Sequence, residues 1–260
     1  AQYVMISEIT IRKVRELAIE DVLSPYVRLS KKGSTLMGLC PFHSEKTGSF
    51  AVTPSKNLFH CFSCNRGGDS ITFIMEKENL SFSAAVEFIA RNHNIPVEYI
   101  REECSAEQMA EARHRESLLT VLDTVQSFFL QNLRATDKEE SLDARAYAYS
   151  RWHEEFCAFA GIGYAPKDGQ AFMDFCKSKA LNEELLYELG MFKRGEDGNT
   201  YAMFRQRIMI PVRNRWGRII AYTARYIGNN RKAPKYINSA TSMIYSKGET
   251  VFGIDRAARL

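Results

Sequence analysis

Two pairs of metal-binding residue types stand close together in the first quarter of the chain. Cys40 and His43 are separated by two residues, Cys61 and Cys64 repeat that spacing, and seventeen residues lie between the pairs. Two intervening residues let a tight turn direct both side chains at one ion, and a loop of this length returns the second pair to it. Three thiolates and one imidazole suit Zn²⁺ and leave no position open for a catalytic water. The spacing therefore predicts one structural zinc ion per chain.

The neighbouring His60 is an alternative fourth ligand. It precedes Cys61 in the segment LFHCF, whose apolar spacing is typical of a strand. Neighbouring side chains of a strand point to opposite faces, so His60 should point away when Cys61 faces the ion. We therefore predict His43 as the ligand. A cluster of buried thiols beside an unrelated histidine, or a disulfide, fits the repeated spacing less well.

Short strands and helices are expected around the two pairs. YVRL and TLMGL flank a turn at residues 32–34 and lead into Cys40, while SFAV and NLFHCF flank a turn at residues 53–56 and lead into Cys61. A helix is expected over residues 7–23, and two more should follow the second pair in SITFIMEKE and FSAAVEFIARN. This order predicts a zinc ribbon covered by helices.

The pattern changes beyond residue 104. After a hinge expected at residues 102–106, one apolar helical stripe is formed by Leu118, Leu122, Val125 and Phe129. Helical patterns recur to about residue 189; then the period becomes two, and RIMIPVRN and GRIIAYTARYI flank a turn at residues 214–217. Strand alternation puts Ile208, Ile210 and Val212 on one face and the arginines on the other, which predicts an open basic surface. The arginines of this surface are Arg205, Arg207 and Arg213.

The net charge of +4 hides an uneven distribution. Residues 201–260 hold twelve Lys or Arg against only Glu249 and Asp255, whereas residues 1–200 hold 23 basic and 29 acidic residues. A concentrated positive field attracts phosphate polyanions, and a surface that only solubilises the protein mixes both signs. Nucleic acid is therefore the expected partner of the basic end.

Composition and length limit the remaining classes. With 260 residues and 45% hydrophobic content, the chain is long enough for two domains. It has no apolar run that would span a bilayer and no short apolar stretch behind basic residues at its start, so we expect a cytoplasmic protein without a membrane partner. Cys104, Cys157 and Cys176 share no close spacing and are expected to be reduced, two of them in the core. The expected fold class is α+β: an N-terminal zinc ribbon, followed by a mixed helical and antiparallel-strand domain.

The first half resembles a known family, the zinc-binding domain of bacterial DnaG-type DNA primases. The resemblance lies in CPFHSEKTGSF, FHCFSCNRGGD and LSFSAAVEFIA, and it assigns the four ligands to Cys40, His43, Cys61 and Cys64. Gly48 stands where the family usually has proline, and Ser63 where it usually has glycine. Exposed aromatic and basic residues of such a ribbon would contact template. The candidates are Lys56, Phe59, Phe62 and Arg66, with core packing as the alternative for the two aromatics.

The resemblance continues in FRQRIMIPVRNRWGRIIAYTARYIGN and APKYINSATSMIYSKGETVFGI, which are similar to the start of the primase RNA polymerase core. It implies a set of residues that bind template and nucleotide: Arg151, Arg205, Arg207, Arg225, Lys235, Asn238 and Lys247. Thr223 and Ala224 replace a glycine pair that the family usually shows before the carried-over Arg225. The implied domains are a template-binding zinc ribbon at 1–103, a hinge and linking helix at 104–142, and the N-terminal part of the catalytic core with a basic platform at 143–260.

The resemblance implies a DNA primase, a DNA-directed RNA polymerase that uses single-stranded DNA and ribonucleotide triphosphates during DNA replication. In that family the carboxylates that bind Mg²⁺ or Mn²⁺ lie in a Toprim segment that follows this point, so we expect no catalytic residue here and no primer synthesis by the chain alone. A DnaB-type helicase is a possible partner through a further region. The alternative is a non-catalytic, zinc-dependent single-stranded-DNA-binding protein of a mobile element.

Overall fold

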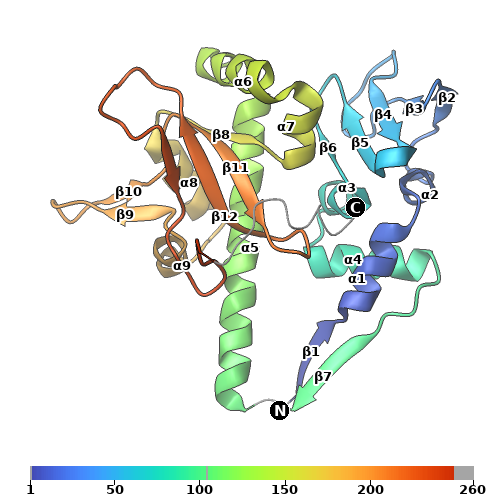
Figure 1. Ribbon diagram of the computed structural model, residues 1–260, viewed down its shortest axis with the longest axis horizontal. Helices are drawn as coiled ribbons and strands as arrows, with labels where there is room; N and C mark the ends of the chain where they lie inside the picture. Colours follow the sequence, from blue (N-terminus) through green and yellow to red (C-terminus); the bar gives the residue numbers. More distant parts are fainter. Residues whose placement is uncertain (1, 104, 249–260) are drawn as a thin grey trace. The chain divides into compact units, whose positions relative to one another are not determined.

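The computed structural model describes residues 2–103 and 105–248, and it describes side chains from residue 5 to 100 and from 105 to 248. The chain forms two compact units: one takes the residues through Ala106 together with Glu154–Ala160, and the other takes Glu107–His153 and the residues from Gly161 onward. Both units combine helices with small antiparallel sheets, which confirms the expected α+β class (Figure 1). No helix in the described ranges is both long and apolar enough to cross a membrane.

The first unit is built on a five-stranded antiparallel sheet in the order β2-β3-β4-β5-β6, and β1 pairs separately with β7. Its strands are β1 Gln2–Ile6, β2 Ser30–Lys32, β3 Thr35–Gly38, β4 Phe50–Thr53, β5 Leu58–Cys61, β6 Gly67–Gly68 and β7 Tyr99–Glu103. Its helices are α1 Glu8–Glu16, α2 Ile19–Leu23, the 3₁₀ turn η1 Pro54–Lys56, α3 Ser70–Glu78, α4 Phe82–Asn92 and α7 Glu154–Ala160. The core joins the sheet to α3 and α4 through buried aromatic and aliphatic side chains.

Side-chain caps explain where three helices of this unit, α1, α3 and α4, begin. Ser7, Asp69 and Ser81 accept hydrogen bonds from the backbone N–H groups three residues on, so each satisfies a donor that a helix N-terminus leaves free. The helix expected over residues 7–23 is interrupted, because α1 ends at Glu16 and α2 begins at Ile19. The strand expected at YVRL is also displaced, since β2 begins at Ser30.

The second unit has a four-stranded antiparallel sheet in the order β13-β12-β11-β8 and a separate β9–β10 pair. Its strands are β8 Gly163–Ala165, β9 Phe192–Arg194, β10 Thr200–Ala202, β11 Arg207–Arg213, β12 Ile219–Tyr226 and β13 Tyr236–Asn238. Its helices are α5 Ala106–Arg134, α6 Glu139–Trp152, α8 Gly169–Ser178 and α9 Glu183–Glu188. The turn expected between β11 and β12 is confirmed: the Asn214 side chain accepts from the N–H groups of Trp216 and Arg218, and Gly217 has a φ of 78°.

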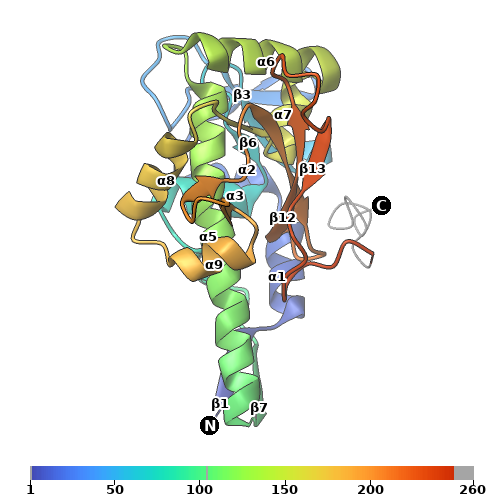
Figure 2. The ribbon, with the colours of Figure 1, turned by 90° about the vertical axis from the view of Figure 1, so that its left-hand side faces the viewer.

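The long helix α5 lies against the sheet of this unit (Figure 2). The predicted apolar stripe forms the contact, since Leu118, Leu122, Val125 and Phe129 are each at most 1% exposed. They share one core cluster with Met209 of β11 and Tyr222 of β12. The core-helix prediction is therefore confirmed.

The prediction of an open arginine surface along β11 is wrong for Arg207. Every residue of β11 from Arg207 through Val212 is buried, and Arg207 is 6% exposed. Arg205 precedes the strand and is exposed. Strand alternation gives the face on which a side chain lies, but it does not show whether other elements cover that face.

Candidate metal centre and nucleic-acid interface

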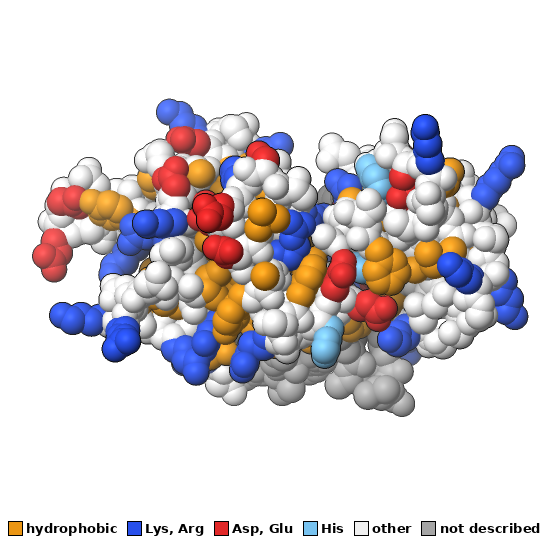
Figure 3. Space-filling model, turned by 90° about the horizontal axis from the view of Figure 1, so that it is seen from above, with side chains coloured by type: hydrophobic (Ala, Val, Ile, Leu, Met, Phe, Trp, Pro, Cys, Tyr) orange, Lys and Arg blue, Asp and Glu red, His pale blue; other side chains and the backbone are white. Residues whose placement is uncertain are grey.

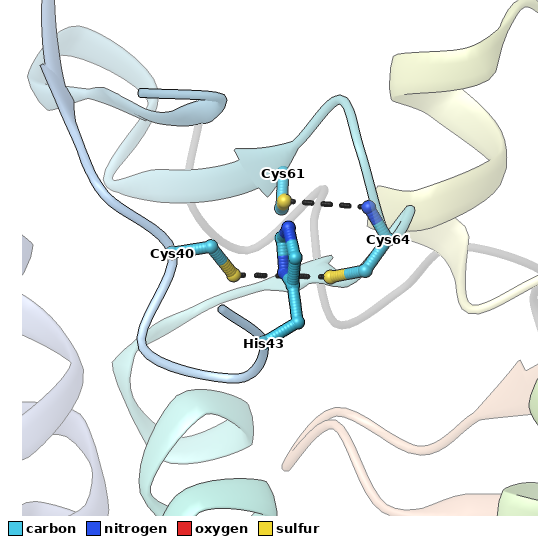
Figure 4. A group of neighbouring side chains, drawn as sticks. All are labelled: Cys40, His43, Cys61 and Cys64. Atoms are coloured by element: carbon cyan, nitrogen blue, oxygen red, sulfur yellow. Dashed lines mark hydrogen bonds between the residues drawn. The ribbon is translucent and has the colours of Figure 1, made fainter. Parts of the chain in front are cut away.

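The two predicted ligand pairs meet in the first unit. Cys40 and His43 lie in the loop after β3, Cys61 ends β5, and Cys64 lies in the turn that follows (Figure 4). One ligand atom from each of the four residues lies within 4.8 Å of all the others. Within residues 2–103 and 105–248, this is the only group of three or more Cys, His, Asp or Glu side chains so arranged.

Polar groups lie close to the sulfur atoms of the site. The Cys61 sulfur lies 3.2 Å from the Ser49 hydroxyl and 3.4 Å from the backbone nitrogen of Cys64, and Arg66 Nη1 lies 3.8 Å from the Cys64 sulfur. Hydrogen bonds with Cys40 and Cys64 lower the pKa of the Cys61 thiol, and hydrogen bonds with Cys61 and Cys64 raise the pKa of the Cys40 thiol. Metal binding requires all three cysteines as thiolates.

The choice of His43 over His60 agrees with this geometry. His60 is outside the group of four; its ring lies 4.6 Å from that of Phe62, and its Nε2 lies 4.0 Å from a Glu154 oxygen. His43 belongs to that group, and its Nδ1 is buried without a hydrogen-bond partner in the described part of the chain. A buried ring nitrogen that has no such partner and lies beside three sulfur atoms is well suited to bind a metal ion.

The donor set is that of a structural zinc site. Three thiolates and one imidazole fill a tetrahedron, and when bound the ion would link the loop after β3 to the end of β5. Cys157 and Cys176 are 1% and 2% exposed and take no part, as expected. Cys104 lies outside the described residues.

The four ribbon residues predicted to contact template have different surroundings. Phe59 is 2% exposed and its ring packs against those of Phe42, Phe50 and Phe73, so the core-packing alternative is right for it. Phe62 is 48% exposed. Arg66 pairs with Glu76 at 3.0 Å and lies over the Phe42 ring, and Lys56 is exposed.

Two arginines of the basic segment stabilise the interior of the second unit. Arg207 donates from Nη1 to the carbonyl oxygens of Ala224 and Pro234 and lies over the Tyr226 ring. Arg218 is 7% exposed and donates to Glu116 at 3.1 Å and to Asp123 at 2.8 Å. The net positive charge of the sequence therefore overstates the positive charge that reaches the surface.

Arg225 has a different environment in the same sheet. Its guanidinium carbon lies 5.0 Å from the ring centre of Tyr236, its cross-strand neighbour on β13, and 5.8 Å from that of Tyr147 on α6. Its Nε and Nη1 atoms are buried without a hydrogen-bond partner in the described residues. A partly buried cation with two such donor atoms suits an anion supplied from outside the chain.

Further side chains extend this arrangement along α6. The Tyr147 ring lies 6.4 Å from that of Trp152, and the Arg151 guanidinium lies 5.7 Å from the Trp152 ring. We call this set the cation–aromatic row; it consists of Arg151, Trp152, Tyr147, Arg225 and Tyr236. Sequence reasoning found its two arginines and missed its three aromatics. Adjacency was the available signal for two of them, since Trp152 follows Arg151 and Tyr236 follows Lys235.

The other predicted residues are distributed around the second unit. Lys235 and Lys247 are exposed, and Asn238 accepts from the Thr223 hydroxyl at 2.9 Å. Thr223, in place of the family's usual glycine, therefore has its own cross-strand partner. Arg205 instead lines a hollow of about 500 Å³ with Lys167 and Tyr201. On the left of Figure 3, Lys and Arg side chains gather along the lower margin of this unit.

Comparisons with known proteins match both the region of the Cys/His cluster and the region that follows it. The chain matches the CHC2 zinc finger family over residues 6–105 and the family of the DNA primase catalytic core, N-terminal domain, over residues 128–258. It is 35% identical over 251 residues to a DNA primase of Halalkalibacterium halodurans, which covers 95% of this chain and 41% of that protein. The chain thus spans about two fifths of the length of this relative.

Solved structures show the same relationship. The zinc-binding and RNA polymerase domains of Aquifex aeolicus primase match with a TM-score of 0.60 and 31% identity, covering 94% of this chain and 57% of that one. A DnaG primase catalytic domain bound to single-stranded DNA matches with a TM-score of 0.51 and 30% identity, covering 57% of this chain and 46% of that one. Together with the Cys/His cluster, these matches support zinc binding and show that the chain belongs to the DnaG-type DNA primase family.

Proposed function

We propose that this chain binds the single-stranded DNA template of a DNA primase, and that the cation–aromatic row is the principal contact. The observation that carries the proposal is the partly buried guanidinium of Arg225: its Nε and Nη1 have no hydrogen-bond partner among the described residues, and it lies beside two tyrosine rings. A backbone phosphate would meet those donors, and bases would stack on the neighbouring aromatic faces. A related catalytic domain that binds single-stranded DNA supports this choice of ligand.

Other residues contribute less directly in this proposal. Lys235 and Lys247 are exposed cations that would meet the triphosphate of an incoming ribonucleotide, with Mg²⁺ or Mn²⁺ held by the catalytic site of a whole primase. The zinc ribbon would add template contact through Phe62 and Lys56. We propose that primer synthesis, a helicase partner and a cytoplasmic location are properties of a whole primase; this chain spans about two fifths of the length of its relative.

The test is a titration of fluorescent single-stranded DNA at several salt concentrations. Arg225→Ala should weaken binding by about tenfold and reduce the slope of log affinity against log salt by about 0.7, the value for one lost phosphate contact. Tyr236→Ala should weaken binding by about 1–3 kcal/mol and leave the slope nearly unchanged, because stacking releases no counterion.

Lys193→Ala is the matched control, since it removes one exposed positive charge from β9 of the same unit. It should change affinity only slightly. Equal losses for Lys193→Ala and Arg225→Ala would show that DNA responds to the total charge of the unit, and the row would then not be the binding site.

A further inference from the structure

Glu45 lies two residues after His43, in the loop between β3 and β4, and its side chain is only 10% exposed. Its Oε1 accepts hydrogen bonds from the backbone nitrogen of Cys40 at 2.7 Å and from that of Ser49 at 3.0 Å. Its Oε2 accepts from the Ser49 hydroxyl and lies 3.1 Å from His43 Nε2. Four donors surround this carboxylate, so it is a fixed part of the loop rather than a solvated surface charge.

The contact with Glu45 gives the two nitrogens of the His43 ring different roles. An ionised carboxylate only accepts hydrogen bonds, so Nε2 must carry the hydrogen and donate it to Glu45. A neutral imidazole carries one N–H, so Nδ1 keeps its lone pair. Nδ1 is the atom that is buried without a hydrogen-bond partner in the described residues.

We propose that Glu45 is the positioning residue of the metal centre: it holds the His43 ring in the orientation and tautomer that offer Nδ1 to the ion. Glu45 is not itself a ligand, because the group whose atoms lie within 4.8 Å of one another consists of the three cysteines and His43. A carboxylate that accepts the second N–H of a metal-binding histidine fixes the ring and raises its basicity.

The same carboxylate closes the loop that carries the first ligand pair. Its bonds to the backbone of Cys40 and Ser49 join the two ends of that loop, and the Ser49 hydroxyl lies 3.2 Å from the Cys61 sulfur. The turn after β5 has its own backbone bonds, from Cys61 to the Arg66 carbonyl and from Asn65 to the Cys61 carbonyl, both 2.8 Å. Removing the carboxylate should therefore disturb the positions of His43 and Cys40 more than the position of Cys64.

The first test measures the Zn²⁺ affinity of the full 260-residue chain by competition with a chromophoric chelator. Glu45→Ala should lower the affinity by about 10- to 100-fold, the usual effect of losing such a partner. Glu45→Gln keeps the shape and one accepting oxygen, so its affinity should fall between those of the wild type and Glu45→Ala. Glu16→Ala is the matched control, because its carboxylate is 68% exposed and distant in sequence; it should leave the affinity within about twofold of wild type.

The second test needs no variant, so it decides the question even if Glu45→Ala does not fold. A long-range ¹H–¹⁵N spectrum of the histidine rings in the Zn²⁺-loaded wild type should show His43 with Nδ1 bound to the metal and Nε2 protonated. Metal bound at Nε2 overturns the proposal, and so does a Glu45→Ala affinity within twofold of the Glu16→Ala affinity.

Discussion

The polar groups at the centre of the first unit converge on one point, whereas the buried cations of the second unit are spread along a sheet. Ligand atoms of three cysteines and His43 lie within 4.8 Å of one another, and the buried Nδ1 of His43 has no hydrogen-bond partner among the described residues. Arg207 and Arg218 instead meet carbonyl and carboxylate oxygens of their own unit. We therefore expect the first unit to depend on an ion for its stability, and the second to obtain its stability from contacts within the chain.

The largest expected effect comes from removing a metal ligand. Cys61→Ser should unfold the first unit, because structural zinc contributes about 10–16 kcal/mol in zinc-finger peptides and a whole domain is stable by only about 5–15 kcal/mol. Hydrogen exchange followed by mass spectrometry would measure protection separately in the two units. His60→Ala, the control, should leave one zinc per chain. Native hydrogen-exchange protection of the first unit in Cys61→Ser would contradict the expectation that this unit depends on the ion.

A smaller loss is expected from the aromatic core of the ribbon. Phe59→Ala should destabilise the first unit by about 3–5 kcal/mol, the cost of truncating a buried phenylalanine, whereas Phe62→Ala should cost less than about 1 kcal/mol because its ring is 48% exposed. Denaturant unfolding of the zinc-loaded variants measures both. If Phe62→Ala proves equally destabilising, the ring is needed for packing and is a poor candidate for stacking with DNA.

In the second unit, a loss of stability is expected at the partly buried ion pair of Arg218 and Asp123. Asp123→Ala should cost about 3 kcal/mol, the lower end for breaking a buried pair, because Arg218 would keep Glu116 as a partner. Glu116→Ala, with a side chain 48% exposed, should cost less than about 1 kcal/mol. The unfolding free energy of this unit, followed by hydrogen exchange, separates the two outcomes. Equal costs would mean that the two carboxylates are interchangeable.

The sequence predicted best those features that neighbouring residues determine. The Cys40/His43 and Cys61/Cys64 spacings predicted the cluster because each pair lies within one tight turn. The caps of α3 and α4 and the turn at residues 214–217 were predictable for the same reason. In each case the interacting atoms lie within a few residues of one another, so their types and spacing were sufficient.

Contacts between distant residues were not predictable in this way. The helix expected over residues 7–23 is interrupted where the Asn57 side chain accepts from Ile19 and donates to the carbonyls of Arg15 and Leu17. Asn57 is about 40 residues away and takes a left-handed backbone, φ 55°, at the end of η1. Similarly, only the packed structure shows that Arg207 is covered and that Tyr147 of α6 lies beside Arg225.

The smallest expected effect is a stabilisation at the end of α6. His153 has φ 61° and ψ 152°, a backbone conformation that costs a non-glycine residue about 1–3 kcal/mol. His153→Gly should therefore raise stability by about 1 kcal/mol, after the greater flexibility of glycine in the unfolded chain is subtracted. A thermal melt compared with that of His153→Ala, which keeps the strain, would measure it. No gain of glycine over alanine would show that the backbone is relaxed there.

The most direct test of the account combines metal removal with template binding. Single-stranded DNA is titrated into the full chain before and after Zn²⁺ is chelated, and hydrogen exchange records which unit is folded. We expect chelation to abolish protection in the first unit only, and to change DNA affinity by less than about tenfold with nearly the same salt slope, because the cation–aromatic row lies in the second unit. Loss of DNA binding together with the metal, while the second unit stays protected, would contradict the account and place the principal template contact on the zinc ribbon.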